Sequence, residues 1–456
     1  MTHPEWALKF KTKGADLRLI RGKYYLYART SVWCPEKNRT KKVTLNQIGT
    51  ISEEYGLIPT GMKKRGKIPE GESPFKVMPK EEVDFLDTFE KIEDPRSTKN
   101  QLYTVSEILL VTLCAVICGA CGWSDVELFG KSKINYLRQY LDFNNGAPSD
   151  DTLRRFYRSI NPSEFERLFR EWVSGLAKMV NCKVIAIDGK SSRHSFDKDG
   201  KNDSNMLHMV SAFATEARIV LGQEKVSEKS NEITAIPKML DWLDVKGHIV
   251  TIDAMGCQYA IADQIVKKEG DYIFSLKGNQ GNLSDDVRLY FEDKKHIKFS
   301  SHTDYDKGHG RIETRECAVV NDVEWLRERH KNWQTIKSII EIKATREMKG
   351  KTTHETRYYI SSLDVSPKEM LKAIRSHWAI ENSLHWVLDM SFNEDYSRIR
   401  KQNAPHIMAI FRHIALNMLQ TAKKSEDSLK RVSIVALRKI CGWDEKHLDT
   451  VLRQKI

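Results

Sequence analysis

Three acidic residues stand where packing alone would not place a carboxylate. Asp188 follows the apolar run of KVIAIDGKSS, and Asp253 follows the similar run of HIVTIDAMG. Both runs are apolar enough to be central strands of a sheet, and ligands commonly bind at the C-terminal edge of such strands. We predict that each strand ends at its aspartate, although a single aspartate after a strand is more often a turn or helix-capping residue.

The third acid is Glu381, in the middle of a helix predicted over residues 366–390. Residues spaced three and four apart share one face of a helix, and here that face reads Met370, Ile374, Trp378, Glu381, His385 and Leu388. A glutamate in an apolar stripe is rarely buried unless it is paired or bound to a metal. The alternatives are a pair with His377 or His385, and a zinc site, which the absence of an H-E-x-x-H motif disfavours.

Together the three acids suit divalent-metal chemistry. Carboxylate oxygens, often combined with phosphate oxygens, are the ligands of Mg²⁺, and Mn²⁺ can substitute for it. Two such ions would hold the attacking and leaving oxygens of an in-line displacement at a phosphodiester, so no protein nucleophile is needed. We therefore expect Asp188, Asp253 and Glu381 to be both catalytic and metal-binding.

Two other short motifs are weaker evidence of a functional site. The sequence DGKS is similar to the end of a phosphate-binding P-loop, but that motif needs a glycine five residues before Gly189, and position 184 is valine. The cysteines at 114, 118 and 121 have the spacing of a radical iron–sulfur cluster, but they lie in a stretch predicted to be a buried helix. We interpret them as packed thiols.

The composition is that of a folded protein that binds a polyanion. Hydrophobic residues make up 40% and charged residues 30% of the chain, which excludes a disordered or membrane-embedded protein. The longest apolar run, Ile108–Trp123, is too short for a bilayer span and no secretory leader opens the chain, so we expect a cytoplasmic protein with no membrane partner. The net charge is +12, with much of the excess in residues 1–75. Nucleic acid is the expected partner, and a solvated basic face is the alternative.

The chain divides into regions of different periodicity. Residues 1–60 are predicted to be a small basic β-rich module that contacts DNA, and residues 61–76 a linker. Residues 77–180 are predicted to be a helical domain. Two of its helices, on either side of residue 160, are either a helix-turn-helix that places Arg154 and Arg155 against DNA or a plain scaffold.

Beyond residue 180 strands alternate with helices, which is typical of an α/β fold. We assign residues 181–310 to the first part of a catalytic core and residues 311–362 to a β-rich insertion. Residues 363–422 complete the core with the glutamate helix and the helix after it. Residues 423–456 are predicted to be a C-terminal helical tail.

A set of motifs in order gives this chain a family resemblance. They are VIAIDGK, LHMVSAF, EKSNEITAIPKMLDWLD, IVTIDAMGCQ, DYIFSLKGNQGNL and IRSHWAIENSLHWVLDMSFNED. Over residues 80–422 the chain resembles the DDE transposases of the ISAs, or H-repeat-associated, insertion-sequence family. The resemblance implies an RNase H-like catalytic core with a β-rich insertion, preceded by a helical region, and Asp188, Asp253 and Glu381 as its metal-binding triad.

One departure from related transposases changes the expected DNA contacts. A Tyr-x2-Arg-x3-Glu-x6-Lys signature often surrounds the glutamate, but here the matching positions are Ile374, His377, Glu381 and Leu388. The phosphate contacts must therefore come from other residues, for which we propose Lys190, Lys277, Asn279, Gln280, Arg398, Arg400 and Lys401. Trp325 and Trp333 of the insertion either stack on an unpaired base or pack in the core.

The expected function is therefore that of a DNA transposase. Such an enzyme cuts at the terminal inverted repeats of its element and joins the freed 3′-hydroxyl to target DNA. We expect a homodimer or larger assembly on DNA, because two ends must be held together. A metal-dependent nuclease of the same fold without strand transfer and a transposase-derived DNA-binding regulator are the alternatives.

Overall fold

The chain forms two compact units, Met1–Lys76 and Val77–Ile456, and each is described by itself. The computed structural model describes residues 4–11, 15–20, 23–34, 39–52, 56–59, 84–96, 101–179, 182–195, 206–226, 231–293, 296–308 and 310–454. The predicted linker, residues 61–76, lies outside this part of the chain. Within it, no helix is both long and apolar enough to cross a bilayer.

The first unit is a small antiparallel sheet, as its alternating apolar residues predict. Its four strands pair in chain order after one short helix, and these elements are α1 (Glu5–Leu8), β1 (Ala15–Ile20), β2 (Lys23–Cys34), β3 (Arg39–Ser52) and β4 (Gly56–Pro59). Among its described side chains, those of Ala7, Leu17, Leu26 and Ile51 form a buried cluster.

The second unit begins with helices, as predicted for residues 77–180. They are α2 (Asp84–Phe89), α3 (Val105–Ile117), α4 (Trp123–Ser132), α5 (Ile134–Leu137), α6 (Asp150–Ser159) and α7 (Pro162–Met179). The apolar helix α3 is central, and a capping box between Thr104 and Glu107 satisfies its first backbone amides. Its neighbours pack aromatic rings together, such as those of Trp123 and Tyr157, stacked at 4.8 Å.

The three closely spaced cysteines do not share one buried helix, which corrects their predicted placement. Only Cys114 lies within α3, while Cys118 ends that helix and Cys121 precedes α4. All three are free, and burial raises the pKa of the Cys114 thiol well above its usual range. Nothing in the described part of the chain groups three metal-ligating side chains around them.

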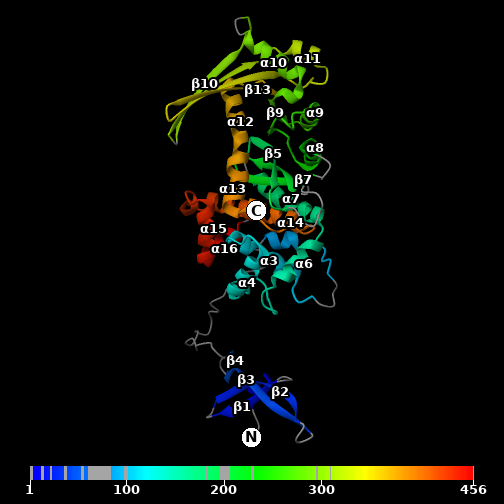
Figure 1. Cartoon of the computed structure of the whole chain (residues 1–456), viewed down its shortest axis with the longest axis vertical. Helices are drawn as coiled ribbons and strands as arrows, with labels where there is room; N and C mark the ends of the chain where they lie inside the picture. The colour runs from blue at the N-terminus through cyan, green and yellow to red at the C-terminus, as the bar shows by residue number, and fades with distance from the viewer. Residues whose placement is uncertain are drawn as a thin grey trace. The chain divides into compact units, whose positions relative to one another are not determined.

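A mixed nine-stranded sheet follows, in the order β10-β11-β12-β13-β9-β8-β5-β6-β7 among the described residues (Figure 1). Its first part alternates with two helices and consists of β5 (Val184–Ser192), β6 (Leu207–Ala214), β7 (Ile219–Lys225), α8 (Glu232–Trp242), β8 (Ile249–Ile252), α9 (Tyr259–Lys267) and β9 (Asp271–Leu276). The strands β5, β6 and β7 form an antiparallel meander, whereas β8 pairs in parallel with both β5 and β9. This is the predicted series of strands and helices.

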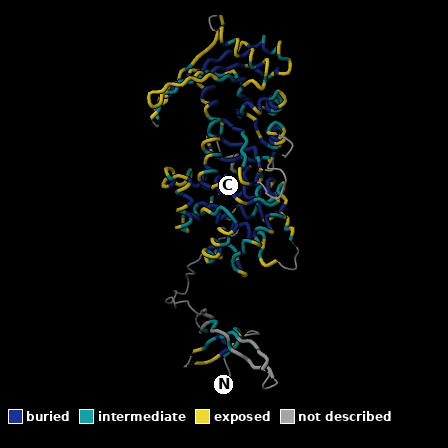
Figure 2. The backbone as a smooth tube through the Cα atoms, viewed as in Figure 1, coloured by how far each residue is buried: buried dark blue, intermediate teal, exposed yellow. Residues whose placement is uncertain are grey.

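The predicted insertion extends this sheet instead of forming a separate layer. After η4 (Gly278–Gln280) and α10 (Asn282–Glu292), an antiparallel meander contains β10 (Ser300–Gly308), β11 (Arg311–Val320), α11 (Glu324–Arg329), β12 (Ser338–Met348) and β13 (Lys351–Ser361). The meander thus begins at Ser300, before the predicted start at residue 311. It joins the sheet because β13 pairs with β9, and its hairpin ends are exposed (Figure 2).

One long helical segment crosses the sheet from the meander to the helical region (Figure 1). It consists of α12 (Pro367–Ile380), a π-helical turn η5 (Glu381–His385) and α13 (Trp386–Phe392). As predicted, Ser366 caps it and Pro367 takes the first turn. The π-helical turn begins at Glu381, and such turns often occur at functional sites.

The chain ends in helices that close the core around α3. They are η6 (Glu394–Tyr396), α14 (Ala404–Ser425), η7 (Asp427–Leu429), α15 (Ile434–Trp443) and α16 (Glu445–Leu452). Helix α14 is buried along most of its length and packs against α3, α7 and β7. The predicted helical tail is thus part of the same hydrophobic cluster as the helices at 84–179.

Candidate active site

The alternation of side chains along the strands brings the acids to one face of the sheet. Ile185 and Ile187 of β5 pack with α8 and α9, so Val184, Ala186 and Asp188 face the opposite side. That side is covered by α12, which packs against β5. The sheet therefore directs the Asp188 side chain toward the helical segment that carries Glu381.

Strand register places the two aspartates side by side. The parallel pairing of β5 with β8 ends with Ile187 opposite Ile252, so Asp188 and Asp253 are the next residues on neighbouring strands. One prediction is corrected here: β8 ends before Asp253, but β5 continues through Asp188 to Ser192. The reason is that β6 keeps pairing with β5 where β8 stops.

All three acids line one pocket of about 360 Å³. Its lining also includes side chains from β8, β9 and α12, namely Thr251, Ser275, Lys277, His377 and Trp378. Glu381 is exposed in this pocket, at the first residue of the π-helical turn. Among the described residues, no hydrogen bond or ion pair holds its carboxylate.

The expected histidine partners of Glu381 have other contacts. His377 Nδ1 lies 3.0 Å from Thr251 Oγ1, which ties α12 to β8 beside the pocket. His385 Nδ1 lies 3.6 Å from Asp188 Oδ2. Burial lowers the pKa of His385 to about 3, so this imidazole is neutral near pH 7 and leaves the charge of Asp188 uncompensated.

The two aspartates are electrostatically unfavourable in this pocket. Burial, then the charge of Asp253, raises the pKa of Asp188 to about 7, against a hydrogen bond from the Gly189 amide at 2.9 Å. Burial also raises the pKa of Asp253, although the backbone amides of Gly256 and Met255 hydrogen-bond its Oδ1. Neighbouring like charges and low solvation both disfavour ionised carboxylates, and a bound cation would relieve both.

The donor set therefore suits a divalent cation. Carboxylate oxygens from β5, the residue after β8 and the π-helical turn line one pocket, and burial together with the charge of Asp253 raises the pKa of Asp188. As the side chains stand, no three candidate ligands in the described part of the chain are close enough to hold one ion. Binding an ion thus requires the side chains to close around it.

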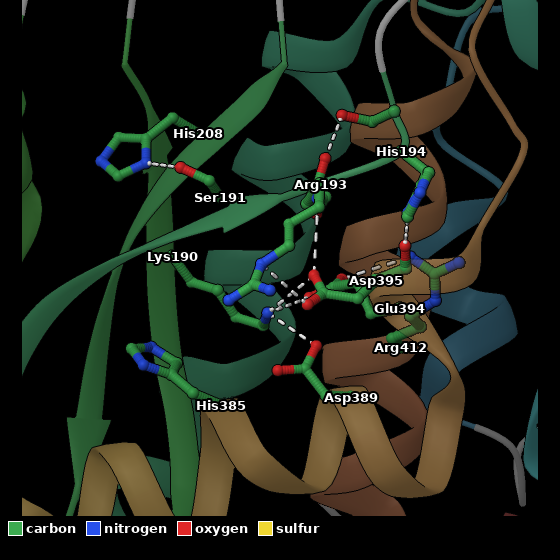
Figure 3. A network of polar contacts seen from close by, with 12 residues as sticks. Lys190, Ser191, Arg193, His194, His208, His385, Asp389, Glu394, Asp395 and Arg412 are labelled. Atoms are coloured by element: carbon green, nitrogen blue, oxygen red, sulfur yellow. Dashed lines mark hydrogen bonds and ion pairs between the residues drawn. The ribbon is translucent and has the colours of Figure 1, made fainter.

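Lys190 is not among the residues that line this pocket, and its predicted DNA contact stays a prediction. Its Nζ lies 2.7 Å from Asp389, 3.4 Å from Asp395 and 3.8 Å from Glu394, and only 12% of its side chain is exposed (Figure 3). Arg412 Nη1 lies 3.2 Å from Glu394 on the other side. Lys190 thus neutralises a carboxylate cluster between β5 and α13.

Lys277, Asn279 and Gln280 follow β9 and lie at or near the pocket. Lys277 lines it, and its charge acts to lower the pKa of Asp253. The Asn279 side-chain amide donates to the Ala254 carbonyl at 2.7 Å, and that of Gln280 donates to the Cys257 carbonyl. These two amides position the loop after Asp253. Of the three residues, only Lys277 places its own positive charge near the acids.

The remaining predicted DNA contacts lie outside the pocket lining. Arg398 is exposed, Arg400 Nε donates to the His194 carbonyl at 2.9 Å, and Lys401 is partly exposed between η6 and α14. Arg154 and Arg155 lie on α6, where they pair with Asp150 and Asp151 one turn earlier. Their DNA roles stay predictions.

The two tryptophans predicted in the insertion pack in the core. Trp333 is 6% exposed, and Trp325 stacks on Tyr290 with ring centroids 4.6 Å apart. Neither lines the acid pocket, whereas Trp378 does. The sequence reasoning missed Trp378 because it counted that residue only as part of an apolar stripe.

The sequence reasoning also missed Glu232 as a residue close to the two aspartates. It begins α8, and its charge raises the pKa of both Asp188 and Asp253. A Cβ atom at Gly189 would lie 2.1 Å from Glu232 Oε1, so the glycine leaves room for this carboxylate beside β5. The Gly after Asp188 was the only sequence signal of this close approach.

Two family models match this chain. The family model described as Transposase DDE domain matches residues 183–418, and the one described as DDE_Tnp_1-associated matches residues 86–173. The H repeat-associated putative transposase YhhI of Escherichia coli K12 is 41% identical over 371 residues, which cover 79% of this chain and 95% of that protein.

A second relative and one solved structure also match this chain. The putative transposase YncI of Escherichia coli O157:H7 is 42% identical over 355 residues, which cover 76% of this chain and 90% of that protein. The cryo-EM structure of the piggyBac transposase synaptic complex with hairpin DNA matches with a TM-score of 0.37 and 10% identity, over 82% of this chain and 76% of that chain. DDE transposases generally use divalent metal ions. The chain therefore belongs to the transposase DDE domain family and is an insertion-sequence transposase, an enzyme that cleaves DNA and transfers the cut strand.

Proposed function

We propose that the catalytic core is RNase H-like and that Asp188, Asp253 and Glu381 are its metal-binding and catalytic residues. The strands β7, β6, β5, β8 and β9 support the fold, because an antiparallel meander is followed by two parallel strands joined through helices. The single observation that carries the site is the pocket lined by all three acids, where Asp188 is held with its pKa raised to about 7.

We further propose Mg²⁺ as the ion, with Mn²⁺ as a substitute. When bound, the ions lower the pKa of a water or DNA 3′-hydroxyl and stabilise the departing oxygen. The chain's own residues position the site: Thr251 and His377 fix α12 against β8, and the Gly189 amide orients the Asp188 carboxylate. Lys277 lies where it can bind a phosphate next to the acids.

The DNA partners we propose are the terminal inverted repeats of the element and a target duplex. The basic N-terminal unit, the α6–α7 pair and the segment with Arg398, Arg400 and Lys401 supply sequence-independent phosphate contacts in this proposal. A homodimer or larger assembly is proposed from the reaction, since two ends must be cut and joined together.

A cleavage and joining assay tests the triad. The full chain, incubated with Mg²⁺ and a duplex that ends in the terminal repeat, is expected to cut at the repeat boundary and to join the freed 3′ end to a target plasmid. Asp188→Asn is expected to lose both products, while the control Asp285→Asn, exposed on α10, keeps them.

The outcomes separate the alternatives. Equal cutting by Asp188→Asn and the unaltered chain would contradict the triad. Cut ends that are never joined would indicate a nuclease without strand transfer. Repeat binding with no metal-dependent product would indicate a regulator.

A further inference from the structure

A second cavity adjoins the acid pocket within the larger unit. It has a volume of about 660 Å³ and lies between α12 and the face of β11, β12 and β13. The residues that line both cavities are Glu355, Arg357, Tyr359, Ile374 and Trp378. A ligand whose reacting group lies at the acids can therefore extend directly into this second cavity.

Arginines dominate the lining of this cavity. Five of them line it, against three carboxylates, and they are Arg311, Arg315, Arg346, Arg357 and Arg375. Glu313 forms ion pairs with three of these arginines. It is 3% exposed, and its oxygens lie 2.7 Å from Arg315, 3.5 Å from Arg346 and 3.6 Å from Arg311. A positive excess thus remains, because one buried carboxylate is shared by three guanidinium groups.

Arg315 has an unused hydrogen-bond donor in this wall. Its side chain is 8% exposed, yet Nη1 has no hydrogen-bond partner among the described residues and lies 3.9 Å from Asp306 Oδ2. A buried guanidinium donor without a partner is costly unless a ligand satisfies it. Guanidinium groups bind phosphate oxygens particularly well, because their donors match that geometry.

Trp378 supplies an aromatic surface at the junction of the two cavities. It lies one turn before Glu381 on α12, and the Arg357 guanidinium lies over its ring, 5.0 Å from the centroid. Unpaired bases stack on aromatic rings whatever their sequence, and arginine adds cation–π attraction. Trp325 and Trp333, by contrast, are used in core packing.

We propose that this cavity, here called the arginine groove, binds an unpaired stretch of the DNA strand that is being cut or joined. In this proposal Arg346 and Arg357 contact phosphates and Trp378 stacks on a base. The inference rests on the proposed function of the acid pocket, because it takes the shared wall as the path of the strand. A paired duplex would present only its backbone to the groove and leave Trp378 unused.

The test compares two DNA ligands on the full chain in EDTA, so that no metal chemistry takes part. One is a duplex with a single-stranded extension, and the other is the same duplex with a blunt end. Fluorescence anisotropy measures the affinity of the chain for each ligand, and the two affinities are compared as a ratio. Phosphate contacts to the duplex part contribute equally to both affinities and therefore cancel in this ratio. Trp378→Ala is expected to lower this ratio by about fivefold or more, and Trp378→Phe to keep most of it.

Arginine variants and controls complete the test. Arg346→Ala is expected to weaken binding of the extended duplex and to reduce its salt dependence more than that of the blunt duplex. The controls Trp443→Ala and Arg288→Ala, both exposed elsewhere, should leave the ratio unchanged. Melting temperatures equal to that of the unaltered chain show that each variant is folded.

Two results would overturn the proposal. If the folded Trp378→Ala and Arg346→Ala variants bind each ligand as tightly as the unaltered chain does, no DNA binds in the groove. If both variants weaken the two ligands by the same factor, the groove contacts duplex backbone only. Asp188→Asn should keep the ratio, so a failure of the triad and a failure of the groove are distinguishable.

Discussion

Two groups of carboxylates lie along β5, and they differ in what surrounds them. The acid pocket holds Asp188 and Asp253 with Glu381 exposed beside them, and burial lowers the pKa of His385, whose Nδ1 lies 3.6 Å from Asp188. The lysine cluster, defined as Asp389, Glu394 and Asp395 around Lys190, begins on the same face of the strand two residues later. Here Lys190, Arg193 and Arg412 all lie within ion-pair distance.

The two groups differ in how their charges are balanced. In the lysine cluster Lys190, Arg193 and Arg412 pair with the acids. In the acid pocket burial and like charge raise the pKa of Asp188 to about 7, although Lys277 and Arg357 also line the pocket. The proposed metal site is thus the group in which the carboxylates have fewer ion pairs within the protein.

The largest expected effect is the loss of DNA strand cleavage when one carboxylate of the acid pocket is neutralised. Asp253→Asn should lower strand cleavage by at least about 10³-fold, because several kcal/mol of metal-dependent stabilisation are lost. Its thermal midpoint without metal should stay the same or rise, since a repulsion is removed. Cleavage assays and melting curves measure both.

Asp395→Asn is the matched control in the lysine cluster. It should lower the thermal midpoint and leave cleavage within about tenfold of the unaltered chain. A larger loss of activity from Asp395→Asn than from Asp253→Asn would reverse the comparison.

Removal of Lys190 should have the next largest effect. Lys190→Met leaves three carboxylates of the cluster short of a cation, and breaking such a largely buried pair costs about 3–5 kcal/mol of unfolding free energy. The shift of the urea midpoint measures this cost. Lys246→Met is the control, because the Lys246–Glu269 pair is 66% and 67% exposed and should cost under about 1 kcal/mol.

Added metal ions should stabilise the folded chain only by binding in the acid pocket. An ion at a hundred times its dissociation constant adds about 2.7 kcal/mol to the stability of the state that binds it. Mg²⁺ or Mn²⁺ should therefore raise the melting temperature of the unaltered chain and of Lys190→Met. Asp188→Asn should lose most of this rise, and an equal rise in all three proteins would place the ion elsewhere.

The smallest effect concerns acid sensitivity near the lysine cluster. Burial, then His385, Arg412 and Lys190, lowers the pKa of His413 to about 3. A neutral buried histidine stabilises the fold above its unfolded pKa of 6.5, and this stability is lost as the pH falls toward 3, by about 1.4 kcal/mol per unit.

His413→Leu removes this titration. Urea midpoints measured from pH 7 to pH 5 should fall less steeply for the variant than for the unaltered chain. Parallel slopes would show that His413 is protonated or solvated in the folded state.

Most strands and the faces they present were predictable from the sequence. The alternation in KVIAID and HIVTID predicts buried strands, and equal placement of Asp188 and Asp253 after those runs predicts that they meet. The start of the Glu381 helix was also predictable, because Ser366 and Pro367 are local signals. The triad as a set could be proposed because its members follow local patterns.

What could not be predicted depends on contacts between distant residues. The continuation of β5 past Asp188 depends on β6, and Lys190 pairs with Asp395, which lies 205 residues later in the chain. The packing of Trp325 and Trp333 and the pairing of β13 with β9 are likewise tertiary. No local period encodes which partner such a residue finds.

The π-helical turn changes how distances along the sequence should be counted. Each residue of a regular α-helix turns the chain by about 100°, so the additional residue held in a π-helical turn rotates everything after it by roughly that angle. Side chains beyond His385 therefore point in directions that a motif counted from Glu381 does not anticipate. Asp389 is one such side chain, so deleting one residue between Glu381 and His385 is expected to turn it away from Lys190, while Glu381 lies before the change.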